Sequence, residues 1–398
     1  MGISSGIPLY IVLSTLLIWL TRENIDISTV GLFALTQIPW SIKFLWAPLV
    51  DNLKIPFLTD HLGQRKSWLL LTQILLIISI LLLGFSDPLE NIFLTAIYAL
   101  FVSFFSANQD IIIDAYRIEI LDEKSQGAGA AMTQFGYRIG GILVGAGSLY
   151  LKSVFSWASV FVIIASLIFV LMILTIFVLP ERKEKKRRKI KKKLTEPFRE
   201  FIYRNAMTKV LLIITFIFFF KFGDVIAGVM ANPFYVKTGF TNIEIANASK
   251  FFGVIMTVLG VFVGGFLVKK YGLLKSLIIS SFFQIFSNLL YVMVDQIGPN
   301  FNVLLIAVSG ENFSGGLGSA AFVAYLSTLC NKSYTGTQYA LLSSFMGLSR
   351  TILSSPSGFL VEMFGWTKFF IFSTFLGFPG LFLLFWMRKH FPISEQKP

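Results

Sequence analysis

Twelve apolar segments, each about as long as a helix that spans a lipid bilayer, follow one another along the chain. The first six cover approximately residues 2–21, 28–50, 67–85, 91–117, 127–150 and 157–179. The second six cover approximately residues 208–231, 245–268, 273–294, 301–329, 338–362 and 366–387. Hydrocarbon leaves no water to pair with backbone groups, so such segments form helices. The sequence therefore predicts an all-α membrane protein with twelve transmembrane helices.

The composition agrees with a membrane protein and offers little for catalysis. Of the 398 residues, 55% are hydrophobic and 14% are charged, and a soluble chain cannot bury so much apolar surface. The single cysteine, Cys330, excludes an internal disulfide and argues against a thiolate metal site. The two histidines, His61 and His390, fall in predicted loops. With no nucleophile–histidine pair, phosphate loop or metal-ligand cluster, we expect no enzyme, no cofactor and no bound metal.

A basic segment lies between the two sets of six. Residues 181–209 contain 13 Lys and Arg against four Glu. Such a block beside a membrane helix is typical of a cytoplasmic loop and can touch anionic lipid, so we do not expect nucleic-acid binding. With the N-terminus in the cytoplasm, 25 Lys and Arg fall on the cytoplasmic side and four in outer loops. The positive-inside rule then predicts that both termini are cytoplasmic.

The two sets of six helices indicate an internal duplication. The fifth and eleventh segments match at one constant offset, in the residues Gln126, Ala128 and Arg138 against Gln338, Ala340 and Arg350. Chance similarity among apolar helices is the alternative. We expect a first half at 1–179, a linker at 180–207, a second half at 208–390 and a tail at 391–398. Parallel halves joined by a cytoplasmic linker are the plan of the major facilitator superfamily, whose substrates bind between the halves.

The first segment is short. It begins at Gly2, and residues 2–20 only just cross the hydrocarbon at about 1.5 Å per residue. We expect that this helix lacks its cytoplasmic half, through either a misassigned start codon or a real truncation.

The stretch Ser106–Glu119, SANQDIIIDAYRIE, places charges inside the fourth segment. Asp110, Asp114 and Arg117 are spaced i, i+4 and i+7, so they share one face of a helix. A charge at bilayer depth costs several kcal/mol and persists only where it is paired or faces water. We interpret this face as part of a polar transport cavity. A charge network that locks neighbouring helices together is the alternative.

Further ionisable side chains lie inside other segments. Lys43 is basic, and Lys221 and Asp224 are close enough along the chain for a local ion pair. The candidates for proton coupling are Asp110, Asp114, Asp224 and Glu311. The candidates for substrate binding are Asn108, Gln109, Arg117, Arg138, Lys221, Asn312 and Arg350. Structural pairing, or ties between helices, is the alternative for each of them.

Two local patterns bear on helix packing and gating. Glycines at 139–147 and at Gly315–Gly318 predict close approach of helices. The loop Thr59–Trp68, TDHLGQRKSW, fits a D-x-x-G-x-R-K pattern. Its residues Asp60, Gly63, Arg65 and Lys66 are candidates for a cytoplasmic gate that clamps helix ends.

Longer motifs resemble the AmpG family of muropeptide permeases, bacterial inner-membrane members of the major facilitator superfamily. The most specific are QDIIIDAYRIEIL and LCNKSYTGTQYALLSS, and further matches such as KFLWAPLVD, FKFGDV and VEMFGW extend over nearly the whole chain. The resemblance implies proton-linked import of anhydromuropeptides, a role in cell-wall recycling and, where that circuit exists, in β-lactamase induction. Two departures are the short N-terminus and a longer loop after Asp51.

We therefore predict a monomeric, proton-coupled importer of anhydromuropeptides in the bacterial inner membrane. The alternatives are a transporter of another bulky anion, such as an acyl-CoA or a siderophore, and a non-transporting membrane sensor derived from a transporter.

Overall fold

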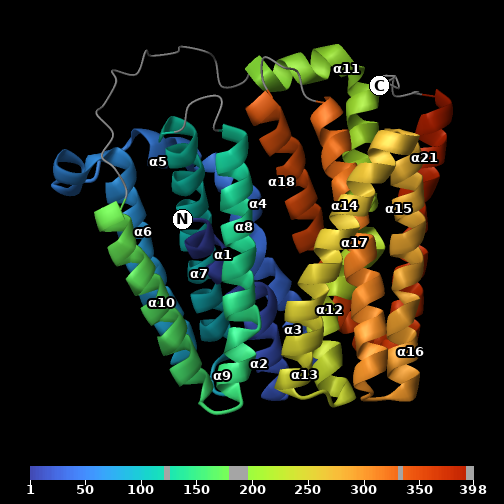
Figure 1. The fold of residues 1–398 in the computed structure, drawn as a ribbon, viewed down its shortest axis with the longest axis horizontal. Coiled ribbons are helices and arrows are strands. Elements are labelled where there is room, and N and C mark those ends of the chain that lie inside the picture. Colours follow the sequence, from blue (N-terminus) through green and yellow to red (C-terminus); the bar gives the residue numbers. More distant parts are fainter. Residues whose placement is uncertain (121–125, 179–195, 330–334, 391–398) are drawn as a thin grey trace. The chain divides into compact units, whose positions relative to one another are not determined.

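The computed structural model describes residues 1–120, 126–178, 196–329 and 335–390, which fold into helices and contain no strand (Figure 1). Each of the twelve predicted segments coincides with helical structure. Among the described residues, eight helical stretches are long and apolar enough to cross a membrane. The chain forms two compact units. The N-terminal unit contains residues 1–26 and 35–189, and the C-terminal unit contains residues 27–34 and 190–398.

The N-terminal unit is a bundle in which several spans are interrupted. The first span consists of α1 (Gly2–Tyr10), a π-helical segment η1 (Ile11–Thr15) and α2 (Leu16–Arg22). The second continues from the 3₁₀ segment η2 (Phe33–Gln37) through α4 (Ile38–Ile42), the 3₁₀ segment η3 (Lys43–Leu45) and α5 (Ala47–Asn52). The remaining helices are α6 (Leu58–Gly84), α7 (Ile92–Ile120), α8 (Gln126–Gly145), α9 (Gly147–Lys152) and α10 (Trp157–Val178).

Glycines let α1 approach α8 with almost no side chain between the backbones. A methyl group at Gly6 would lie 2.1 Å from the carbonyl oxygen of Tyr137, and one at Gly140 would lie 2.4 Å from that of Ile3. Inside a membrane, dispersion contacts between closely approaching helices replace the hydrophobic effect as the packing force. The glycines predicted to permit close approach near residue 140 therefore do so.

The C-terminal unit begins with α3 (Ile27–Leu32), which comes from the start of the second predicted segment. The seventh and eighth spans contain α11 (Glu196–Phe219), α12 (Phe222–Thr238), α13 (Asn242–Ile245), the π-helical segment η5 (Ala246–Phe252) and α14 (Gly253–Tyr271). The rest consists of α15 (Leu273–Ser287), α16 (Leu289–Ile297), α17 (Phe301–Leu329), α18 (Thr335–Ser354), α19 (Ser357–Phe364), α20 (Trp366–Leu376) and α21 (Phe378–His390).

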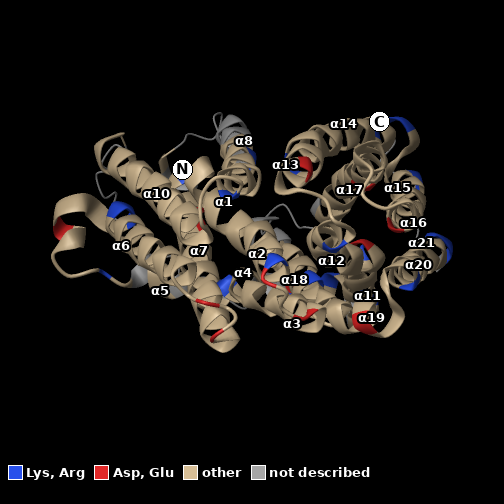
Figure 2. Ribbon diagram, turned by 90° about the horizontal axis from the view of Figure 1, so that it is seen from below, with Lys and Arg blue, Asp and Glu red and all other residues tan. Residues whose placement is uncertain are grey.

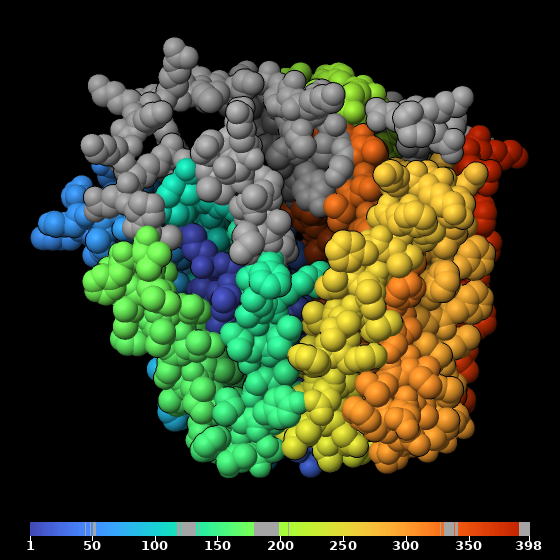
Figure 3. All heavy atoms as spheres, viewed as in Figure 1, coloured from blue at the N-terminus to red at the C-terminus, as the bar shows by residue number. Residues whose placement is uncertain are grey.

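Within this unit, α14 lies against α17 (Figure 1). A methyl group at Gly260 would lie 2.2 Å from the carbonyl oxygen of Phe313, and one at Gly316 would lie 2.3 Å from that of Thr257. The opposite side of α14 is apolar and open, since Phe262 is 74% exposed, and the helix forms part of the face shown in Figure 3. Such a helix suits a lipid-facing position, packed on one side only.

The short helix α3 packs on α19 in a similar way. A methyl group at Gly31 would lie 2.7 Å from the backbone nitrogen of Gly358. The backbone N–H of Ser28 donates a 2.9 Å hydrogen bond to Glu362. The start of the second span is therefore anchored inside the C-terminal unit.

Three boundaries differ from the predictions. The stretch predicted as the loop Thr59–Trp68 is helical, because α6 begins at Leu58 and changes direction at Gly63, where φ is +75°. Residues 196–207, predicted as linker, belong to α11. The seventh span is broken between Phe219 and Phe222. The rest of the predicted linker, Cys330 and the predicted tail lie outside the described residues.

Candidate functional site

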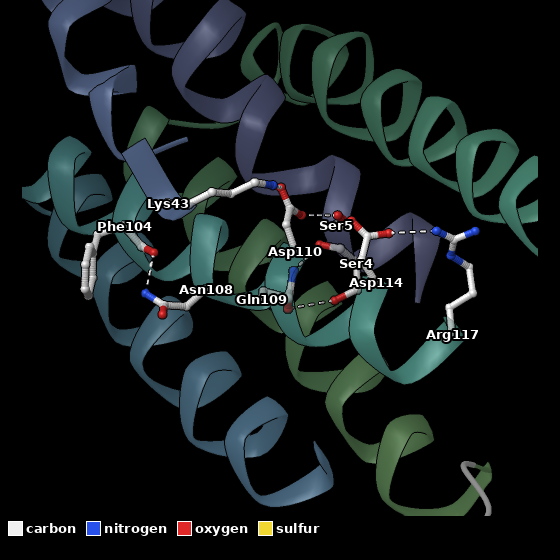
Figure 4. Close-up of polar contacts among 9 residues, drawn as sticks. All are labelled: Ser4, Ser5, Lys43, Phe104, Asn108, Gln109, Asp110, Asp114 and Arg117. Carbon is white, nitrogen blue, oxygen red and sulfur yellow. Dashed lines mark hydrogen bonds and ion pairs between the residues drawn. The ribbon is translucent and has the colours of Figure 1, made fainter. Parts of the chain in front are cut away.

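Charged residues are sparse along the helices, whose ribbons are mostly tan in Figure 2. In the N-terminal unit several of them gather on α7 (Figure 4). Asp110 Oδ2 lies 3.7 Å from the ammonium of Lys43, which projects from η3. The other oxygen, Oδ1, accepts a hydrogen bond from the hydroxyl of Ser5 on α1. The carboxylate therefore has both a counter-charge and a neutral donor, each from a different span.

A neutral network continues from this pair. Gln109 Nε2 donates to the carbonyl of Ser4 at 2.7 Å, and Ser4 Oγ donates to Gln109 Oε1 at 3.1 Å. Gln73 on α6 donates to Ser4 Oγ at 3.1 Å. These bonds tie α1, α6 and α7 together in a buried position. Ser4 and Ser5 were not predicted as site residues, because hydroxyl residues are common in apolar segments. Only the tertiary structure brings them next to Gln109 and Asp110.

Asp114 and Arg117 lie further along the same side of α7 (Figure 4). Arg117 Nη2 and Asp114 Oδ1 are 3.4 Å apart, and Asp114 interacts electrostatically with Asp110. Asn108 is placed differently, because its amide donates to the carbonyl of Phe104 in the same helix at 2.8 Å. Arg138 is a partly buried residue of α8 and makes no ion pair with a carboxylate of the described residues.

In the C-terminal unit, one charged residue of the candidate site lies in the break of the seventh span. Lys221 lies between α11 and α12, outside helical geometry. Its ammonium donates to Ser319 Oγ at 2.7 Å and to the carbonyl of Gly315 at 3.4 Å, both on α17. The local ion pair with Asp224 allowed by spacing does not form, although the two charges interact at longer range. The break, which helix periodicity does not reveal, turns Lys221 toward α17.

Glu311 on α17 is the electrostatic centre of this second cluster. It interacts with four charged residues, Lys221, Asp224, Lys250 and Arg350. Glu311 Oε2 accepts a 2.7 Å hydrogen bond from the amide of Asn312, whose Oδ1 accepts another from Thr257 at 3.1 Å. The structure thus brings together five of the residues proposed from the sequence, and it adds Lys250.

Lys250 was not among the predicted site residues, because it lies near the start of its span, where lysines often extend toward the interface. Here it belongs to η5, and its ammonium donates to Asn232 Oδ1 on α12 at 2.7 Å. The available signal was a lysine at the sixth position of the predicted apolar segment 245–268.

The predicted gate motif lies at the start of α6. Arg65 and Lys66 are buried, at 8% and 9% exposure, whereas Asp60 is exposed. The neighbouring side chains of Gln64 and Trp68 donate to the carbonyl of Leu53 at 2.6 and 2.8 Å. They satisfy a backbone group that the end of α5 leaves unpaired. Gly63 supplies the positive φ that this turn requires.

The sequence of this chain matches a family of known membrane transporters over nearly its whole length. The model of the Major Facilitator Superfamily matches residues 1–297 and 222–398. The Rickettsia felis protein named transporter AmpG 4 is 39% identical, with 98% of this chain and 95% of that protein aligned. The anhydromuropeptide permease of Escherichia coli is 35% identical, with 98% of this chain and 78% of that protein aligned. The chain belongs to the AmpG family of the major facilitator superfamily. This AmpG-family chain is therefore a multi-pass membrane transporter with a small-molecule substrate, and not an enzyme.

Solved structures of other transporters share the fold of this AmpG-family chain. The nucleoside transporter NupG superposes with a TM-score of 0.74 at 16% identity, over 97% of each chain. A bacterial homologue of the human lysosomal transporter Spinster gives 0.73 at 14% identity, over 100% of this chain and 96% of the other. Both likenesses show the all-helical transporter fold predicted from the apolar segments, and they carry no information on substrate.

Proposed function

We propose that this protein imports anhydromuropeptides from the periplasm to the cytoplasm across the bacterial inner membrane, driven by protons. The observation that carries the proposal is the 35% identity to the Escherichia coli anhydromuropeptide permease along nearly the whole chain. Anhydromuropeptides combine an anhydro-muramyl sugar with a peptide and so present hydroxyls, amides and carboxylates. The alternatives of an acyl-CoA or siderophore transporter and of a sensor have no comparable support.

The polar groups inside the spans suit such a ligand. Cationic side chains recognise carboxylates, and amide groups recognise hydroxyls and peptide groups. The proposed anion-binding residues are Arg138 in the N-terminal unit and Lys221 and Arg350 in the C-terminal unit. Substrate movement would follow alternating access.

Proton coupling needs a carboxylate whose surroundings change during the cycle. Asp110, Asp114, Asp224 and Glu311 are the proposed carriers. Asp110 is supported by its two partners from other spans, Lys43 and Ser5, because rearrangement of those spans would change how strongly its anion is held. The positive charge of the basic segment at 181–209 supports a cytoplasmic position for that segment and, through the predicted topology, for both termini.

The test is uptake of labelled N-acetylglucosaminyl-anhydromuropeptide into proteoliposomes, with and without an inwardly directed proton gradient. Accumulation above equilibrium that requires the gradient is the expected result. Uptake to equilibrium alone would remove proton coupling and keep the substrate. Absence of uptake by folded protein would contradict the substrate class.

A further inference from the structure

Lys250 occupies an unusual backbone position for a membrane cation. It lies in the π-helical segment Ala246–Phe252, which inserts extra backbone into the eighth span. The next residues, Phe251 and Phe252, are 59% and 36% exposed, whereas Lys250 turns toward α12. Each added helical residue rotates the following side chains by about 100°. The π-helical segment therefore aims the ammonium inward, and such segments occur frequently at functional sites.

The hydrogen-bond partner of Lys250 does not neutralise it. Asn232 Oδ1 accepts one of the three ammonium hydrogens at 2.7 Å and carries no charge. Lys250 interacts with Glu311 at longer range but makes no ion pair with a carboxylate of the described residues. Lys221, which also interacts with Glu311, likewise donates only to neutral oxygens among its printed partners, those of Ser319 and Gly315. A buried charge is costly unless paired, so this cluster favours an anionic ligand.

We infer that Lys250 binds a carboxylate of the transported ligand and that Asn232 holds the ammonium in place when no ligand is bound. This inference rests on the proposed function. It means that the C-terminal unit recognises the negative charge of the ligand. Lys250 is partly exposed, and its ammonium has two donors besides the one bonded to Asn232. A carboxylate adds an opposite charge that the amide oxygen of Asn232 lacks, so the ligand outcompetes the amide oxygen for the ammonium.

A purely structural role would tie η5 to α12 through the bond to Asn232. That role depends on the hydrogen bond and is indifferent to the charge of the ligand. Ligand charge is therefore the variable that separates the two roles.

The experiment measures binding to the purified full-length protein in detergent, with an anhydromuropeptide and with the same compound after amidation of its carboxylates. Wild-type protein is expected to prefer the carboxylate form. Lys250→Met should weaken binding of that form by about tenfold to a hundredfold and leave the amidated form within about twofold. Lys250→Arg should keep most of the preference. Lys237→Met, an exposed lysine in the last turn of α12, is the matched control and should change neither constant.

A second variant keeps the test decisive if Lys250→Met does not fold. Asn232→Asp preserves size and places a carboxylate beside the ammonium, where it competes with the ligand. The carboxylate form should then bind about tenfold more weakly, with the amidated form unaffected. Equal weakening of both forms, or an unchanged preference in Lys250→Met and Asn232→Asp, would overturn the inference. Failure of wild-type protein to bind either form would instead contradict the proposed substrate class, and the inference with it.

Discussion

The two units differ in what the partly buried lysines inside their spans contact. In the N-terminal unit, Lys43 faces the carboxylate of Asp110 at 3.7 Å. In the C-terminal unit, Lys221 and Lys250 donate to neutral oxygens, those of Ser319, Gly315 and Asn232. The first arrangement compensates its own charge, while the second leaves positive charge for another group to balance. The N-terminal pair is suited to hold or release a proton, whereas the C-terminal cations are suited to hold an anion.

Removing the carboxylate of the N-terminal pair should have the largest effect on stability. Asp110→Leu leaves the Lys43 ammonium without its counter-charge and the Ser5 hydroxyl without its acceptor. We expect a loss of roughly 3 kcal/mol in the free energy of unfolding, at the lower end of the range for broken buried pairs, because the Lys43 side chain is 32% exposed. Denaturant titration in detergent measures it.

The double variant Lys43→Met/Asp110→Leu is the control for that prediction. Replacing both charges by apolar groups removes the unpaired ammonium, so stability should return to within about 1 kcal/mol of wild type. If the double variant is as unstable as Asp110→Leu, the ion pair is not the cause and the proposed contrast between the units fails.

Lys221→Met should destabilise the protein less. The variant lacks the two hydrogen bonds that Lys221 donates to neutral oxygens. Ser319 Oγ still donates to the carbonyl of Gly315 at 2.7 Å. Neither partner oxygen of Lys221 carries a charge, so the expected loss is about 1 kcal/mol in the same titration. A loss equal to that of Asp110→Leu would show that Lys221 is a member of a tight ion pair, and the two units would then be alike.

The smallest effect is expected for Ser319→Ala, at about 0.5 kcal/mol, since Lys221 keeps the carbonyl of Gly315 as an acceptor. Ser166→Ala in α10 is the matched control, because the Ser166 hydroxyl also bonds a carbonyl of its own helix, at 2.9 Å, and lies at an exposed position. A loss above about 2 kcal/mol for Ser319→Ala alone would mean that Ser319 is the main anchor of the Lys221 charge.

Much of the first site could be predicted from sequence, because α7 is one uninterrupted helix. The spacing of Asp110, Asp114 and Arg117 places them on one side, as Figure 4 shows. Their partners were not predictable. Ser5 and Lys43 come from other spans, and the pairing depends on how close α1 and η3 lie to α7. The second site was predicted as a set of residues without its geometry, since Lys221 lies in a break and Lys250 in a π-helical segment.

The sequence by itself determined the membrane spans and the close helix contacts at glycine. Hydrophobicity and side-chain size are local properties, and a helix in lipid must satisfy its own backbone. The tertiary structure decided which cations meet a carboxylate and which meet a neutral oxygen. Departures from regular helix, such as the break at Lys221, rotate a side chain onto another neighbour, and only the packed bundle determines where those departures occur.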